Sequence, residues 1–340
     1  MLKKIISPIM LMLFALFLTA CSPAAPTSPS SSPSGSAAAS AHYPVTITNW
    51  NYAGDEVSQT FTKAPEKVLA VYQGSIETMI ALGLEDHVAA SYGLDNAVKP
   101  EWQAGLTKMN YQEDKFAPDR ETVTLLQPDF IFSWSSFFGE KTLGDVTNWQ
   151  PNGTGTYINT NTRRGSHNRT IENEFSDILN IGKIFDVEAK AEALVKQMRD
   201  EIDSTLAAAK GQSAPKVAIL EFLDGGTTNY GATSLGGDMV TRLGGTLAMP
   251  EVPKAGFEDI IAANPDVIFV VTMPGRGEDA AKATQEALDK VLKEPALASL
   301  DAVKNNRVVD IMLGDMYASG PRTFDGIKTF SAGMYPDLKK

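Results

Sequence analysis

The sequence predicts two α/β lobes joined by a single long, rigid helix. Three observations support this fold class. Short apolar strands alternate with helical segments from about residue 43 onward, which favours parallel strands with helices packed against them. One twelve-residue pattern occurs twice, beginning at Glu121 and at Glu258. Between the two halves, residues 187–210 carry apolar side chains at helical spacing.

The first lobe is expected to span residues 43–186 and to begin with a β-hairpin around Gly54-Asp55. The two hairpin strands are predicted at Val45–Asn49 and Gln59–Thr62. Three short apolar runs then predict buried strands, and two segments predict helices. The strands are Lys67–Tyr72, Val88–Tyr92 and Phe130–Trp134, and the helices are Gly74–Leu82 and residues 121–127.

The second lobe, residues 212–340, repeats the same alternation of elements. The expected strands are Lys216–Phe222, Val267–Met273 and Arg307–Ile311, and the expected helices are Asp238–Leu243 and Thr323–Tyr335. Glycines and prolines between these segments supply the turns. The two halves therefore predict two similar lobes rather than one continuous sheet.

The repeated pattern reads E-x-[VI]-x-x-x-x-P-D-x-I-F and includes Pro128-Asp129 in one half and Pro265-Asp266 in the other. A helix ends near the residue that precedes a proline. Each unit is therefore expected to be a helix, a Pro-Asp turn and a buried strand. Glu121 and Glu258 then lie in the first turns of equivalent helices, where the helix dipole favours negative charge.

Residues 187–211 are predicted to form the helix between the lobes, about 36 Å long at 1.5 Å per residue over residues 187–210. Gly211 and Pro215 end it. One face is apolar and consists of Ala191, Leu194, Val195, Met198, Ile202 and Leu206. A single helix of this length is expected to hold the two lobes as a rigid clamp.

The first 42 residues predict export and attachment to a membrane. Residues 1–20 have the form of a signal peptide, with Lys3 and Lys4 before the apolar run Ile9–Leu18, which is too short to span a bilayer. Leu18-Thr19-Ala20-Cys21 resembles a bacterial lipobox, which implies cleavage before a lipid-modified Cys21. Residues 21–42 are rich in Ser, Pro and Ala and are expected to form a flexible tether.

Composition excludes several classes of function. The net charge is −11 and becomes −13 once the two lysines of the signal peptide are removed, so a nucleic acid is not an expected partner. A single cysteine cannot form an internal disulfide or a thiolate metal site. The three histidines, His42, His87 and His167, lie in unrelated segments, so no metal site is predicted.

Several short motifs, in this order and spacing, resemble the class III solute-binding lipoproteins of bacterial ABC importers. These proteins serve iron–siderophore complexes, cobalamin and haem. Besides the two repeated units, the resemblance includes Pro65–Val68, Glu77–Gly83, Pro295–Leu300, Ala302–Val308 and Gly320–Arg322, and it covers residues 43–337. It implies two Rossmann-like lobes, a ligand cleft between them and no enzymatic activity.

The resemblance also implies partners and a location. The matching positions for docking to an ABC permease dimer are Glu121 and Glu258, one in each lobe. The protein is expected to be a monomer without a cofactor, lipid-anchored at Cys21 to the outer side of the cell membrane. Its ligand is expected to be a chelated Fe³⁺ complex, a ferric siderophore, with cobalamin or haem as the alternative.

Candidate ligand contacts lie in the loops after the carboxyl ends of the strands, where open α/β sheets bind ligands. Those loops also bring Asp315-Met316-Tyr317 into consideration. The basic segment 152–169 suggests anion contacts through Arg163 and Arg164, although a solvated surface loop is an open alternative. The complete predicted set is Tyr72, Trp134, Phe138, Arg163, Arg164, Tyr230 and Arg276.

An exported hydrolase is the competing class of function. The sequence contains neither a GxxxxGK[ST] phosphate loop nor a GxSxG nucleophile motif. Catalytic groups can also be assembled only in three dimensions, so this alternative stays open on the sequence alone.

Overall fold

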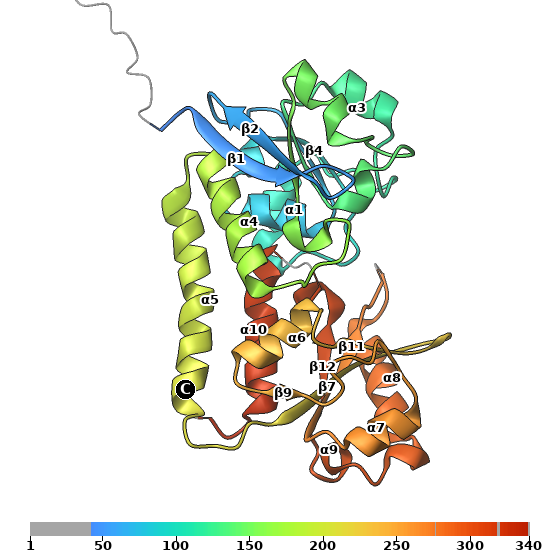
Figure 1. The fold of residues 1–340 in the computed structure, drawn as a ribbon. Coiled ribbons are helices and arrows are strands. Elements are labelled where there is room, and N and C mark those ends of the chain that lie inside the picture. The colour runs from blue at the N-terminus through green and yellow to red at the C-terminus, as the bar shows by residue number, and fades with distance from the viewer. Residues whose placement is uncertain (1–41, 276, 318–319, 339–340) are drawn as a thin grey trace, which may run out of the picture. The chain divides into compact units, whose positions relative to one another are not determined.

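In the computed structural model, the described part of the chain forms a two-stranded hairpin, a four-stranded sheet in the first half and a six-stranded sheet in the second half (Figure 1). One long helix connects the two halves along the chain. The structure describes residues 42–275, 277–317 and 320–338. The predicted signal peptide and all of the tether except residue 42 therefore lie outside the described residues. Within the described residues, no helix is long and apolar enough to cross a membrane.

An antiparallel hairpin precedes the first sheet, as the sequence predicts. It consists of β1 (Val45–Trp50) and β2 (Glu56–Phe61), so the second strand begins three residues earlier than expected. The Asn51 side chain accepts hydrogen bonds from the backbone N–H groups of Gly54 and Asp55 at 3.0 and 2.9 Å. Gly54 has a φ of +97°, a conformation that glycine adopts without steric cost.

The first sheet has four parallel strands in the order β4-β3-β5-β6. Three of them are the predicted strands, and β6 was not expected, because the sequence there reads as a polar loop. The strands are β3 (Val68–Val71), β4 (Val88–Tyr92), β5 (Phe130–Ser133) and β6 (Gly155–Ile158). Its helices are α1 (Gln73–Ala81), α2 (Gln103–Lys108), α3 (Arg120–Leu126) and α4 (Ile171–Ile184).

The second sheet has the order β10-β8-β7-β11-β12, with the short β9 also paired to β7. The pairs β7·β11, β11·β12 and β7·β9 are parallel, whereas β8 is antiparallel to both of its neighbours. The strands are β7 (Lys216–Leu223), β8 (Gly226–Asn229), β9 (Thr246–Leu247), β10 (Lys254–Ala255), β11 (Val267–Thr272) and β12 (Val308–Met312). The helices are α6 (Leu235–Arg242), α7 (Phe257–Ala263), α8 (Ala280–Leu292), α9 (Asp301–Lys304) and α10 (Thr323–Met334).

The two repeated sequence units form the same structure in both lobes. Helices α3 and α7 each end at a residue with positive φ, Gln127 and Asn264, and lead through Pro-Asp into β5 and β11. Asp129 accepts hydrogen bonds from the N–H groups of Glu66 and Lys67, both at 2.8 Å, and Asp266 accepts one from Lys216 N at 2.7 Å. Each aspartate thus ties its own strand to the start of the neighbouring strand, which explains why both units carry it.

The long helix α5 (Glu188–Ala208) packs against α4 of the first lobe and against α10 of the second (Figure 1). One continuous hydrophobic core extends through both lobes and includes residues of α1, α4, α5, α6 and α10. Alternate residues of each central strand face this shared core, and the others face a smaller core within their own lobe. Because the two lobes share a core, the joint between them is packed rather than flexible.

Candidate ligand-binding site

A cavity of about 270 Å³ is enclosed by residues of both lobes. Its wall is formed by residues that follow the carboxyl ends of strands, as open α/β sheets lead one to expect. From the first lobe it is lined by Tyr72, Gln73, Gly74, Asp95, Asn96 and Trp134. From the second lobe it is lined by Tyr230, Met273, Leu313, Gly314 and Tyr317.

Four aromatic rings form a continuous series along the cavity wall. The ring centroids are 4.0 Å apart for Tyr72 and Trp134, 5.9 Å for Trp134 and Tyr317, and 6.3 Å for Tyr317 and Tyr230. Tyr72 has a φ of +81°, an unusual value for a side-chain-bearing residue, at the start of α1. Strained backbone of this kind is found where a side chain must be held in a functional position.

Two of these tyrosines donate their hydroxyl hydrogen to a carboxylate. Tyr72 donates to Asp95, and Tyr230 donates to Glu221 at 2.7 Å. Burial, followed by the neighbouring carboxylate, raises the pKa of both phenols, so both remain protonated donors. Burial also raises the pKa of Asp95. The indole N–H of Trp134 is buried and has no hydrogen-bond partner among the described residues.

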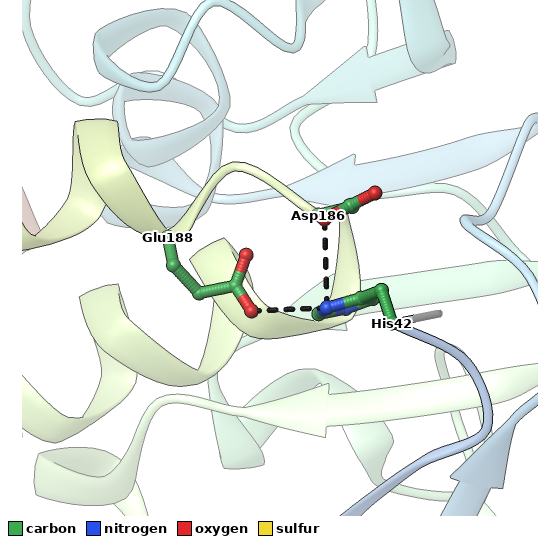
Figure 2. Close-up of side chains that lie close together, drawn as sticks. All are labelled: His42, Asp186 and Glu188. Atoms are coloured by element: carbon green, nitrogen blue, oxygen red, sulfur yellow. Dashed lines mark ion pairs between the residues drawn. The ribbon is translucent and has the colours of Figure 1, made fainter. Parts of the chain in front are cut away.

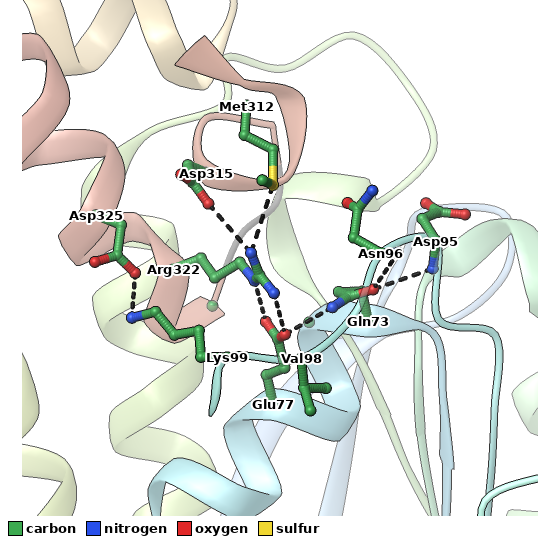
Figure 3. Close-up of polar contacts among 12 residues, drawn as sticks. Gln73, Glu77, Asp95, Asn96, Val98, Lys99, Met312, Asp315, Arg322 and Asp325 are labelled. Atoms are coloured by element: carbon green, nitrogen blue, oxygen red, sulfur yellow. Dashed lines mark hydrogen bonds and ion pairs between the residues drawn. The ribbon is translucent and has the colours of Figure 1, made fainter. Parts of the chain in front are cut away.

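A buried ion pair next to the residues that line the cavity connects the two lobes (Figure 3). The Nε and Nη2 atoms of Arg322, just before α10, lie 2.7 Å from the two carboxylate oxygens of Glu77 in α1. Glu77 is fully buried, and Arg322 is 5% exposed. Gln73 donates to Glu77 at 2.6 Å and accepts from Asp95 N and Asn96 N, so the ion pair supports the residues that line the cavity.

Replacing Asp315, which lies 3.7 Å from Arg322, by asparagine is expected to flatten the pH dependence of stability. Burial raises the pKa of Asp315 to about 7 from 3.8, so the folded protein retains a proton that the unfolded chain releases. The contribution is complete below about pH 4 and is lost as the pH rises through about 7, with a slope of at most about 1.4 kcal/mol per pH unit. Urea unfolding of the wild type and of Asp315→Asn between about pH 4 and pH 7 measures the effect. The same dependence of the free energy of unfolding on pH in both proteins would contradict the raised pKa of Asp315.

The structure brings three of the predicted contacts, Tyr72, Trp134 and Tyr230, together in one cavity. The prediction that Phe138 contacts the ligand is wrong, because its side chain is fully buried in the core of the first lobe. The residues 135–138 form a 3-10 turn, which instead places the half-buried ring of Phe137 5.5 Å from Tyr72. Arg276 lies outside the described residues.

Arg163 and Arg164, the predicted anion contacts, do not line the cavity, so the structure does not support their predicted role there. Their guanidinium groups stack on Trp50 and Tyr52 of the N-terminal hairpin, 4.2 and 4.6 Å from the ring centroids. The reason is that residues 152–169 are not one free loop, since they contain β6 and the 3-10 turn Thr160–Thr162. These elements direct both arginines toward the hairpin.

The predicted set of contacts leaves out three residues that the structure places at the site, although Tyr317 lies in a loop that the sequence analysis considers. Asp95 and Tyr317 line the cavity, and the guanidinium of Arg169 lies 3.8 Å above the Tyr317 ring. Asp95 had a usable signal, because it follows a predicted strand by three residues. Arg169 could not be distinguished from Arg163 and Arg164, because only the fold determines which arginine of the segment reaches the cleft.

One group among the described residues has the side chains needed for a metal, His42 with Asp186 and Glu188 (Figure 2), and none of these residues lines the cavity. His42 Nδ1 lies 3.4 Å from Asp186 and 3.1 Å from Glu188, at the junction of α4 and α5. The other ring nitrogen lies 2.7 Å from the carbonyl oxygen of Lys183. The group fastens the first described residue to that junction.

The predicted docking residues lie at equivalent places in the two lobes. Glu121 is exposed in the first turn of α3, and Glu258 is exposed in the first turn of α7. Each helix also exposes an aliphatic side chain three or four residues later. Leu125 is 77% exposed, and Ile261 is 39% exposed.

Two α/β lobes on a shared helix, with an aromatic cavity between them, define a solute-binding protein. A family model described as periplasmic binding protein matches residues 68–312, and the chain belongs to this family. The petrobactin-binding protein YclQ of Bacillus subtilis is 29% identical over 276 residues, which cover 76% of this chain and 78% of that protein.

Solved structures agree with this assignment. A periplasmic binding protein from Veillonella parvula is 31% identical with a TM-score of 0.80, over 87% of this chain and 92% of that one. The structure titled as an ABC-type Fe³⁺-hydroxamate transport system from Saccharomonospora viridis shares the fold at 21% identity, with a TM-score of 0.64 over 86% of this chain and 99% of that one. The chain is therefore an extracytoplasmic, class III substrate-binding component of an ABC importer, and it is not an enzyme.

Proposed function

We propose that this protein captures a ferric siderophore in the cavity between its lobes and delivers it to an ABC permease. The observation that carries the proposal is the cavity, which both lobes enclose and aromatic rings line. Such a wall suits a large ligand with apolar faces and a few polar groups. The name of the relative that binds petrobactin supports a ligand of the same general kind. Cobalamin and haem are the alternatives.

The ligand class is tested by titrating the protein with candidate complexes and following its tryptophan fluorescence. Trp134 lines the cavity, so an iron chelate bound there is expected to quench its emission. Trp134→Phe should lose most of the quenching while calorimetry still detects binding. Flat titrations with hydroxamate, catecholate and citrate complexes of iron would contradict the proposal, and a response to cobalamin or haem alone would favour those ligands.

We further propose that Glu121 and Glu258 dock the two lobes to the two halves of the permease dimer. In the family that the sequence resembles, one glutamate of each lobe pairs with arginines of the permease. Exposed carboxylates at equivalent positions of α3 and α7, each near an exposed aliphatic side chain, support this role. A helix needs only one cap, and in α3 the Asp119 side chain already supplies it by accepting from Thr122 N at 2.8 Å.

The proposed location is the outer surface of the cell membrane, with the protein held through a lipid on Cys21 and working as a monomer. The supporting observation is the sequence around Cys21, which lies outside the described residues. Mass spectrometry of the mature N-terminal peptide tests the anchor. An unmodified peptide that begins elsewhere than Cys21 would refute it.

A further inference from the structure

Among the residues that the structure describes, the charged side chains that line the cavity or directly support its wall tyrosines are acidic. Asp95 is the one carboxylate in the lining, and no described lysine or arginine lines the wall. Glu221 lies behind Tyr230 and accepts its hydroxyl hydrogen. Among the described residues, neither Asp95 nor Glu221 forms an ion pair, so their charges are not neutralised by a neighbouring side chain. A buried anionic group of a ligand would therefore face uncompensated like charge.

The aromatic wall favours the opposite charge. The faces of Tyr72, Trp134, Tyr317 and Tyr230 carry partial negative charge, and aromatic faces of this kind attract ammonium and guanidinium groups. A phenol that donates to a carboxylate is more electron-rich than a free phenol, which strengthens this attraction at Tyr72 and Tyr230. Arg169 already stacks on Tyr317 at 3.8 Å, so one ring of the series holds a cation in this structure.

Arg169 does not reverse the sign of the cavity. It is not part of the cavity lining, because its guanidinium is engaged with the Tyr317 ring and donates to the Tyr317 carbonyl at 3.4 Å. Its one positive charge is outnumbered by the two carboxylates, Asp95 in the lining and Glu221 behind Tyr230. The carboxylates and the aromatic rings thus favour the same kind of ligand group, a cation.

The size of the cavity indicates which part of a chelate it can hold. At about 270 Å³ it lies just below the range of roughly 300–1,000 Å³ that is typical for drug-sized ligands. In this arrangement of the lobes it has room for one arm of a large chelate, next to Asp95 and the Tyr72–Trp134 ring pair.

We propose that the site selects a ferric chelate with a pendant ammonium group, which Asp95 and the faces of Tyr72 and Trp134 hold, over neutral and anionic chelates. This inference rests on the proposed function, because it specifies the ligand of the same cavity. Selectivity arises from the attraction to the cation and equally from the cost of burying an anion beside Asp95.

The test uses a matched pair of ligands, a linear ferric tris-hydroxamate with a terminal primary amine and its N-acetylated form. Calorimetry is expected to give at least about tenfold tighter binding for the amine form, and weaker binding still for an anionic ferric tris-catecholate. Asp95→Asn should reduce the ratio of the two affinities from at least about tenfold to about twofold or threefold, the remainder coming from the aromatic faces. The ratio is compared within each protein, so a general change of the cavity that affects both forms equally cancels.

Tyr72→Phe provides a second variant in case Asp95→Asn perturbs the fold. It keeps the ring and the carboxylate, so the preference for the amine form should persist, whereas Tyr72→Leu should weaken it. Equal affinities of the wild-type protein for the matched pair, or tightest binding of the anionic complex, would overturn the inference and leave the proposed function intact. No binding of any iron chelate would overturn both.

Discussion

Replacing Arg322 by methionine is expected to lower the free energy of unfolding by about 3–5 kcal/mol. The substitution leaves the carboxylate of Glu77 fully buried and without its two hydrogen bonds from the guanidinium. Removing one partner of a buried pair costs more than the pair itself contributes, because the remaining charge has no solvent to stabilise it. Arg322 also donates to the carbonyl of Ala97 at 2.9 Å, which adds a second unsatisfied group.

The effect is measured by urea unfolding, with Lys196→Ala as the control. Lys196 and Asp200 form an ion pair on the exposed face of α5, and losing an exposed pair costs at most about 1 kcal/mol. The double variant Glu77→Met with Arg322→Met should recover much of the loss, because it removes both members of the pair and leaves neither without its partner. A loss below about 1 kcal/mol for Arg322→Met alone would show that the pair is not the connection described here.

Only one member of the pair between Glu77 and Arg322 could be assigned from the sequence. Glu77 belongs to a short motif in a predicted helix, so its position on α1 could be predicted from the sequence. Its partner lies 245 residues further along the chain. No local pattern connects residues at that separation, and only the packing of α1 against the segment before α10 brings them together.

The fold itself was predictable where a periodic or repeated pattern was present. The strands β3, β4, β5, β7, β11 and β12 are apolar runs with turns at their ends, and the repeated units gave helix, turn and strand in both lobes. The sequence reading missed β6, because Gly155–Ile158 contains threonine and glycine within a polar segment and has only two large apolar residues to mark a buried strand. It also missed α4, whose polar residues Asn173, Glu174 and Asp177 obscured the amphipathic pattern.

Site residues were predictable to the extent that position after a strand decides them. Tyr72 and Trp134 follow this rule, because they come directly after β3 and β5. Tyr230 reaches the cavity differently, because it follows β8, an unpredicted strand that returns antiparallel to β7. Phe138 does not follow the rule, because the direction of a side chain in a 3-10 turn depends on the turn and not on the distance from the strand. The arginines were misassigned because charge complementarity to an assumed anionic ligand was used in place of geometry.

Replacing both Glu121 and Glu258 by alanine is expected to abolish transport while ligand affinity stays within about twofold of the wild type. Both carboxylates are exposed on short helices and neither lines the cavity, so nothing in the site should change. At an interface, removal of one partner of a buried charge pair costs about 2–5 kcal/mol, and two such losses would prevent productive docking. Stability should fall by less than about 1 kcal/mol per substitution, since each acid contributes only a favourable dipole interaction.

Uptake of a radiolabelled iron chelate into vesicles that contain the permease measures the effect, and calorimetry measures ligand affinity in parallel. The matched control is Glu192→Ala with Glu251→Ala, which removes the same charge from exposed positions on α5 and in the loop before β10. Each single substitution at Glu121 or Glu258 should retain partial transport, because the other lobe still docks. Loss of ligand affinity in the double variant, or equal loss of uptake in the control, would refute the docking role, because either result would mean that the two carboxylates act on the ligand or through net charge.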